Sequence, residues 1–290
     1  MKIDFNKFEI PGYLILLIVN AFEVRSGWIL TICQLALGFA VFLPRLGSSN
    51  FLNNYYPFRP VLEFLYILSL LGGVYLNWFN APNHFYLFIA LSLLFIIPNK
   101  EGDTSYLRDN IRWIFIIVMG FATIHKLINP TFINGDFVGY MISVGGFLRP
   151  ILIGGFAPEI KEILIQNIAD ISELTLTDPM LGKTVLMNTG NLPVEHLNKI
   201  FTLLIVGCEL LLVLLFIFFP WRKFTIFSLL LFVGSIGLIV SEFEFASTLL
   251  FMGLLLCPSN FLILKKAFRY TFLIYSVSAI LYNTVWTLTW

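Results

Sequence analysis

Charged residues are scarce in this chain of 290 residues, and that scarcity excludes several classes of protein. Asp, Glu, Lys and Arg make up 12% of the sequence, whereas a soluble domain carries about 25%. So few charges cannot coat a water-soluble globule of this size, which excludes a soluble enzyme and a disordered chain. The net charge of +1 also offers no basic footprint for nucleic acid, so we expect no nucleic-acid partner.

Cysteine and histidine are scarce as well, with three residues of each. Cys33, Cys208 and Cys257 all lie inside apolar runs, and an odd number of such thiols does not form a disulfide framework. Their spacing differs from that of a zinc site, so we expect them to pack in the core and expect no metal. The polar, mixed-charge residues 1–9 are not followed by a small-residue cleavage site, so we also expect no cleavable signal peptide.

Hydrophobic residues are abundant instead, at 58% of the chain, with a mean hydropathy of +0.88. Strands of a membrane barrel alternate between apolar and polar residues, whereas stretches such as 201–219 are apolar on every face. The sequence therefore predicts an all-α fold, a polytopic transmembrane helical bundle in contact with the lipid bilayer. A spanning helix needs about 20 mostly apolar residues, and eight segments are predicted to span: 28–43, 60–78, 82–97, 111–127, 201–219, 224–240, 245–256 and 268–286.

Three other segments are predicted not to cross as simple helices. Residues 10–22 run into Glu23, which favours an interfacial segment, and residues 140–156 contain four glycines, which favours a re-entrant or capping segment. Residues 157–199 are polar and predicted to form an extramembrane loop that begins with an amphipathic helix, because isoleucines recur there at helical spacing. We expect one membrane domain over residues 1–290.

The basic residues of the short connections predict the orientation of the bundle. Connections 79–81 and 241–244 carry no Lys or Arg, and the connections on the opposite side carry many. By the positive-inside rule the basic side is cytoplasmic, which places both termini and residues 157–199 outside. The basic side holds Arg45, Arg59, Lys100, Arg108, Arg222, Lys223, Lys265, Lys266 and Arg269.

Ionisable side chains inside spans are candidate functional groups, because each costs at least about 2.5–3.5 kcal/mol at the bilayer centre. Lys126 ends an apolar run, so it either snorkels to the headgroups or is desolvated, which makes its neutral amine a usable base. Glu209 either makes a helix-packing hydrogen bond or is the partner of a basic group in a shared cavity. Four sites qualify: Glu63, the pair His125 and Lys126, Glu209, and the pair Glu242 and Glu244.

The cost of leaving polar groups alone in lipid also predicts the geometry of a site. We predict that His84, Lys126 and Glu209 line one internal cavity, although they lie far apart in sequence. For His84, which opens a span, an interfacial position is the alternative, and Glu63 is expected near the surface.

A set of short motifs, taken in order, resembles a known family. Asn83-His84-Phe85-Tyr86-Leu87 opens one span. The next span ends in His125-Lys126-Leu127-Ile128-Asn129, followed by Phe132-Ile133-Asn134-Gly135. Downstream comes a span with Glu209, and a later span ends in Leu256-Cys257-Pro258-Ser259. Over about residues 60–260 this pattern resembles the membrane domain of vitamin K-dependent γ-glutamyl carboxylase and its bacterial relatives, the HTTM (horizontally transferred transmembrane) family.

The resemblance implies roles for individual residues. Lys126 matches the family's catalytic lysine, the base that deprotonates vitamin K hydroquinone, and His84 matches a histidine linked to the carboxylation half of the reaction. Asn83 and Tyr86, the neighbours of that histidine, are implied in substrate binding, as are His125, at the position of a second family lysine, and Glu209. A reduced, vitamin K-like quinone is the implied cofactor, and the implied location is a bacterial inner membrane with the site facing outside the cytoplasm.

Two functions follow as hypotheses. The first is a membrane-embedded enzyme that uses a lysine base on a lipid-soluble quinol-type substrate, with a membrane redox partner. Protein γ-carboxylation itself is not expected, because only about 40 residues at 157–199 stand where the carboxylase has its large substrate-binding region. The second is a non-catalytic membrane factor for the maturation or export of a secreted peptide. A DoxX-like redox scaffold and a transporter are further alternatives, without specific residues to support them.

Overall fold

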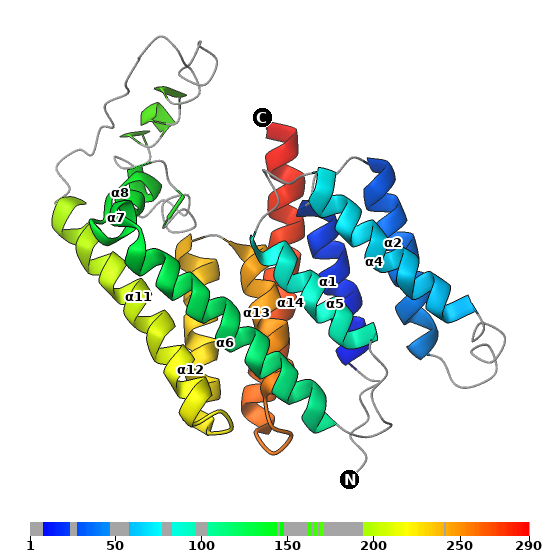
Figure 1. The fold of residues 1–290 in the computed structure, drawn as a ribbon. Coiled ribbons are helices and arrows are strands. Elements are labelled where there is room, and N and C mark those ends of the chain that lie inside the picture. The colour runs from blue at the N-terminus through cyan, green and yellow to red at the C-terminus, as the bar shows by residue number, and fades with distance from the viewer. Residues whose placement is uncertain are drawn as a thin grey trace. The chain divides into compact units, whose positions relative to one another are not determined.

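The computed structural model describes residues 8–23, 28–46, 58–76, 83–96, 104–143, 146–147, 162–163, 165–167, 169–170, 194–240 and 242–289. Every regular element in these ranges is helical, as the sequence predicted (Figure 1). The helices are α1 (Glu9–Glu23), α2 (Trp28–Phe42), α4 (Arg59–Leu76), α5 (Asn83–Ile96), α6 (Thr104–Ile128), α7 (Pro130–Ile133), α8 (Asp136–Ser143), α11 (Val194–Phe218), α12 (Lys223–Ser235), α13 (Phe243–Leu256) and α14 (Leu262–Thr289).

Four helices in this part of the chain are long and apolar enough to cross a membrane, by length and composition. They are Arg59–Leu76, Ser105–Ile128, Asn198–Phe218 and Lys223–Val240, the last of which combines α12 with the π-helical turn Ile236–Val240. Shorter apolar helices include α5, whose 14 residues rise about 21 Å against a hydrocarbon core of about 30 Å. The helices are consistent with an integral membrane protein, and the count of eight spans stays a prediction.

The chain divides into two compact units, which are described separately. Unit 1 comprises Met1–Ile116, Pro220–Leu230 and Phe243–Trp290, and unit 2 comprises Ile117–Phe219 and Leu231–Glu242. Unit 1 is discontinuous in sequence, because the segments of unit 2 interrupt it.

Helix α1 lies in the core of unit 1, where it contacts α2, α13 and α14 (Figure 1). None of the side chains of residues 8–21 is exposed, and Tyr13, Leu16 and Val19 are completely buried. The prediction of an interfacial segment at 10–22 is therefore wrong. An interfacial helix needs a polar face, whereas large apolar side chains surround the axis of α1, and neighbouring helices cover all of its faces.

A chain of buried hydroxyl groups links three helices of unit 1. Tyr13 on α1 donates a hydrogen bond to Ser92 Oγ of α5 at 2.5 Å, and its hydroxyl lies 2.8 Å from that of Tyr66 on α4. The aromatic rings of Phe42 and Phe88 pack on Tyr13 at centroid distances of 4.4 and 5.7 Å. The described core of unit 1 is thus aromatic, with a polar connection between its helices.

Unit 2 is held by an apolar cluster at the start of α11. Helices α7 and α8 contact each other and both contact α11. Phe132, Val138, Phe147 and Val206 form the buried centre of the cluster. Of the predicted segments at 140–156 and 157–199, most residues lie outside the described ranges, and the described residues 162–163, 165–167 and 169–170 are helical.

Candidate functional site

Lys126 lies in the last turn of α6, and the local sequence explains why the helix ends there. An apolar run carries α6 through Ile124, and Pro130 cannot extend a helix because it lacks an N–H and its ring clashes with the preceding turn. The chain restarts at once as α7, where Asn129 is the N-cap and its side chain accepts a hydrogen bond from the backbone N–H of Thr131 at 3.1 Å. This break leaves Lys126 near the end of α6.

Gly135 forms the turn that sets α8 against α11. Its φ of +86° lies in the left-handed region, which favours glycine. A Cβ atom at this position would also lie 3.1 Å from the backbone carbon of Asn198 on α11. The segment from Asn129 to Gly135, which carries part of the family resemblance, therefore has a structural role as a cap and a turn beside Lys126.

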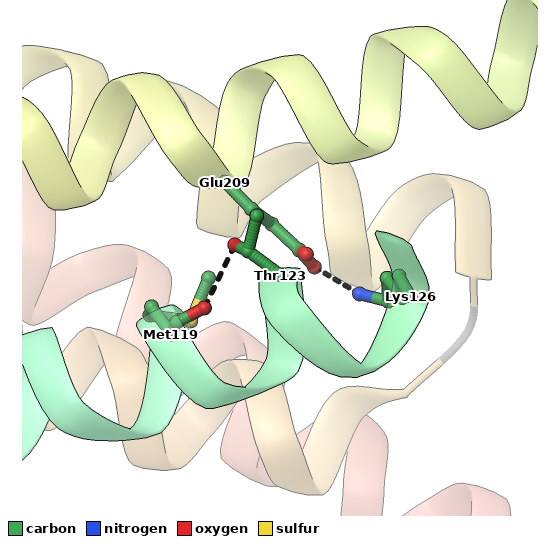
Figure 2. Close-up of polar contacts among 4 residues, drawn as sticks. All are labelled: Met119, Thr123, Lys126 and Glu209. Carbon is green, nitrogen blue, oxygen red and sulfur yellow. Dashed lines mark hydrogen bonds and ion pairs between the residues drawn. The ribbon is translucent and has the colours of Figure 1, made fainter. Parts of the chain in front are cut away.

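Lys126 and Glu209 form an ion pair between α6 and α11, within unit 2. Figure 2 shows the two side chains pointing toward each other, with Lys126 Nζ donating to Glu209 Oε1. The side chain of Lys126 is 23% exposed and that of Glu209 is 7% exposed. The contact expected between Glu209 and a basic group is therefore present, although 83 residues separate the two.

The surroundings of the pair are mostly apolar. The Lys126 ammonium lies 5.5 Å from the centroid of the Phe132 ring, within the range of a cation–π contact. One turn before Lys126, on the same side of α6, Thr123 is buried and donates to the Met119 carbonyl at 2.8 Å, so this hydroxyl is satisfied within α6 (Figure 2). The contacts of the Lys126 ammonium with described residues thus include one carboxylate, that of Glu209, and one aromatic ring.

The second carboxylate oxygen of Glu209 is the most informative atom of the site. Oε2 is buried and has no hydrogen-bond partner among the described residues. Leaving a buried polar atom unpaired is costly, and a native protein usually satisfies such an atom with a protein group, water or a ligand. The pair therefore presents one open acceptor beside a cation.

Of the other predicted site residues, three belong to unit 1 and His125 precedes Lys126 in unit 2. Asn83 and His84 open α5 in unit 1, and their side chains lie outside the described residues. Tyr86, also on α5, is 43% exposed, and His125 is exposed on α6. The shared cavity predicted for His84, Lys126 and Glu209 stays a prediction, of which the structure shows the contact between the last two.

Glu63, which was expected near the surface, makes a local contact on α4. Arg59 Nε donates to Glu63 Oε1 at 2.7 Å, four residues apart on α4. Such i,i+4 pairs stabilise a helix by a few tenths of a kcal/mol. Glu63 therefore serves as a comparison for the long-range pair in unit 2.

Sequence analysis missed two polar residues on the face of α11 that carries Glu209. Thr202 is completely buried, and neither Thr202 Oγ1 nor Asn198 Oδ1 has a hydrogen-bond partner among the described residues. Positions 198, 202 and 209 lie four and seven residues apart, which places them on one face of a helix. That spacing is the signal that could have found them.

The described side chains show no cluster suited to a metal. Among the searched residues, no three His, Cys, Asp or Glu side chains lie together as they would around an ion. The candidate site is thus an acid–base pair in a largely apolar environment.

The fold and the pair define a class, an all-helical protein in which two of four candidate membrane spans are joined by an ion pair. The chain matches no family model, no curated protein and no solved structure. The resemblance to the HTTM family therefore stays a prediction based on the motifs.

Proposed function

We propose that this chain is a multi-pass membrane enzyme in which Lys126 and Glu209 act as a proton-transfer pair on a lipid-soluble acidic substrate of the quinol type. The observation that carries the proposal is the ion pair between two candidate spans, with Glu209 Oε2 open to a donor. The resemblance of the Lys126 and Glu209 segments to the carboxylase-like family supports the same choice of substrate.

The pair can supply the neutral amine that a base requires. An ammonium with a carboxylate and an amine with a carboxylic acid carry the same net charge, and low dielectric surroundings disfavour the charged arrangement. When Glu209 holds the proton, Lys126 Nζ can accept one from a substrate hydroxyl. The substrate then carries a negative charge, which the newly formed ammonium of Lys126 stabilises.

The open carboxylate oxygen fits a donor of this kind. A hydroquinone presents two hydroxyl groups on a flat apolar ring, so one hydroxyl can donate to Glu209 Oε2 while the ring lies against apolar side chains such as Phe132. When bound, a reduced quinone supplies the acidic hydroxyl and the reducing electrons. Lys126 and Glu209 supply the proton acceptor and the charge balance.

The proposal includes an orientation. The short connections rich in Lys and Arg face the cytoplasm of a bacterial inner membrane, and the end of α6 that carries Lys126 faces outward. This orientation brings Lys126 toward the outer leaflet, where a lipid-soluble substrate can reach it from the bilayer.

The test compares substitutions at Lys126 in the purified full-length protein, with vitamin K hydroquinone as the probe and oxygen-dependent oxidation as the readout. Lys126→Arg keeps a cation beside Glu209 but cannot become a neutral base near neutral pH. We expect this substitution to lower the rate at least about 100-fold, as loss of a general base does. Lys126→Met and Glu209→Gln are expected to be similarly inactive.

Glu63→Gln is the matched control, because it removes a carboxylate from the local pair with Arg59 on α4. It should leave the rate unchanged, and unfolding in detergent reports whether each variant remains folded. Full activity of Lys126→Arg would show that the lysine only balances charge and would refute the base. If the wild-type protein does not oxidise the quinol at all, the enzyme proposal fails and the non-catalytic membrane factor becomes the better hypothesis.

A further inference from the structure

A pocket of about 370 Å³ is lined by residues of unit 1, whereas Lys126 and Glu209 belong to unit 2. It is lined by the first turns of α6, by the turn before α12 and by the turn between α13 and α14. Its volume falls in the range of about 300–1,000 Å³ found for ligand sites. The lining residues include Arg108, Asp109, Trp221, Asn260 and Phe261.

Arg108 is the group that suggests a ligand. The central carbon of its guanidinium lies over the ring of Trp221, 5.5 Å from the ring centroid, and this contact restrains the guanidinium plane. Its Nε is buried and has no hydrogen-bond partner among the described residues. A guanidinium held flat with an unused donor is suited to a planar or tetrahedral anion, which it can bind through two parallel hydrogen bonds.

Further positive charge surrounds the same pocket. The ammonium of Lys223 lies 5.5 Å from the centroid of Phe261, one of the lining rings. Burial raises the pKa of the Cys257 thiol to about 11, while the positive charges of Arg108 and Lys265 act in the opposite direction. Among the described residues that line the pocket, Asp109 is the acidic one, and its side chain is exposed.

The helix ends add to this field. Helices α6, α12 and α14 all begin beside the pocket, at Thr104, Lys223 and Leu262. The N-terminus of a helix carries a partial positive charge and free N–H groups, which favour anions. Two of these starts are also starts of candidate spans, where lipid headgroups lie, and Trp221 is of a type enriched at that level.

We propose that this pocket binds a phosphate-bearing anion, with Arg108 as its ligand, Lys223 as a nearby cation and the headgroup of an anionic lipid or a free phosphate as its source. This chemistry agrees with the cations beside the pocket, with the unpaired Nε of Arg108 and with the position of the pocket at the ends of candidate spans. The basic side of the chain was predicted to be cytoplasmic, and the cytoplasmic leaflet is the one rich in anionic lipid.

The experiment titrates the detergent-purified full-length protein with dioleoylphosphatidylglycerol and measures binding of the first lipid by native mass spectrometry. We expect Arg108→Gln to weaken binding at least about 10-fold, since a charge-assisted contact to phosphate is lost. The matched control is Arg222→Gln, which removes the same charge from an exposed neighbour of Trp221 that does not line the pocket. It should change the affinity less than about 2-fold, because surface charge alone contributes little.

Inorganic phosphate at millimolar concentration, added as a competitor, separates the two sources. Displacement of the lipid identifies the phosphate group alone as the ligand, and lipid binding that resists phosphate identifies the headgroup with its acyl chains. Equal losses for Arg108→Gln and Arg222→Gln would reduce the effect to a general basic surface and overturn the proposal. If Arg108→Gln does not fold, Arg108→Lys takes its place, because it keeps the charge but removes the paired donors of the guanidinium, and unchanged affinity in that variant also overturns the proposal.

Discussion

The buried hydroxyl chain of unit 1 predicts an unusual order of mutational effects. Ser92 Oγ donates to the Phe88 carbonyl at 2.7 Å, so its only proton is used. The proton of Tyr13 is then the one shared with Ser92, and Tyr66 must donate to Tyr13. All three side chains are completely buried, so no water is at hand to replace a lost partner.

Removing the middle of this chain should cost more than removing its end. Tyr66→Phe deletes the terminal donor, for which we expect about 1 kcal/mol of lost unfolding free energy. Tyr13→Phe breaks two hydrogen bonds and leaves the buried Tyr66 hydroxyl with Ser92 as its remaining partner, for which we expect about 2–3 kcal/mol. Both single substitutions remove the hydrogen bond between Tyr13 and Tyr66, so the loss in the double variant should be about 1 kcal/mol smaller than the sum of the two single losses.

The measurement is equilibrium unfolding of the purified protein in mixed micelles by increasing the fraction of sodium dodecyl sulfate, followed by circular dichroism. Tyr75→Phe is the control, because Tyr75 lies on the same helix as Tyr66 but is 80% exposed, and no change is expected. Additive losses, or a Tyr13→Phe variant no less stable than Tyr66→Phe, would refute the reasoning. Either result would mean that the hydrogen bond between the Tyr13 and Tyr66 hydroxyls contributes little to stability.

Two further predictions concern α13 and its end. Gly253→Ala would place a methyl group 2.2 Å from the ring of Phe268, so we expect about 1–3 kcal/mol of destabilisation in the same titration. The control Gly72→Ala, where a Cβ atom would have nothing within 4 Å, should stabilise α4 by about 0.5–1 kcal/mol. Equal effects of the two substitutions would contradict the packing of Gly253 against Phe268. In a variant with Cys33 and Cys208 replaced by Ala, Cys257 should resist N-ethylmaleimide at pH 8, because a pKa of about 11 leaves about one thiol in a thousand ionised. The thiol should react as the pH rises toward 11 or after the protein unfolds. Rapid labelling of the folded protein at pH 8 would be incompatible with the burial of Cys257.

The sequence predicted the long apolar helices well and their polar ends poorly. The span predicted at 111–127 is part of α6, Thr104–Ile128, and the span predicted at 201–219 is part of α11, Val194–Phe218. Both helices begin about seven residues earlier than predicted, because their first turns are polar and hydropathy does not detect a helix there. The pairing of Lys126 with Glu209 could be predicted because a charge within a span requires a partner.

Features that depend on tertiary packing could not be predicted. The apolar residues of α1 fit an interfacial position or a core position equally well in a sequence window, and only the packing of α2, α13 and α14 around the helix decides between them. The hydroxyls of Tyr13, Tyr66 and Ser92 are unremarkable in their own segments, and only the meeting of three helices makes them a network. The pocket beside Arg108 likewise joins residues from three distant turns.

The burial of α1 by the last two helices also sets the order in which the protein can be assembled. Tyr13 packs against Phe251 at 6.5 Å between ring centroids, and at about 5–20 residues per second a ribosome needs roughly 12–50 s to make the chain between them. Through that interval the first helix has no native neighbour on the faces that α13 and α14 later cover, so lipid or another protein must shelter it. The ion pair of unit 2 joins residues only 83 positions apart and can close while the ribosome is still at work. The centre of unit 1 is therefore completed after the ion pair of unit 2 has had time to form.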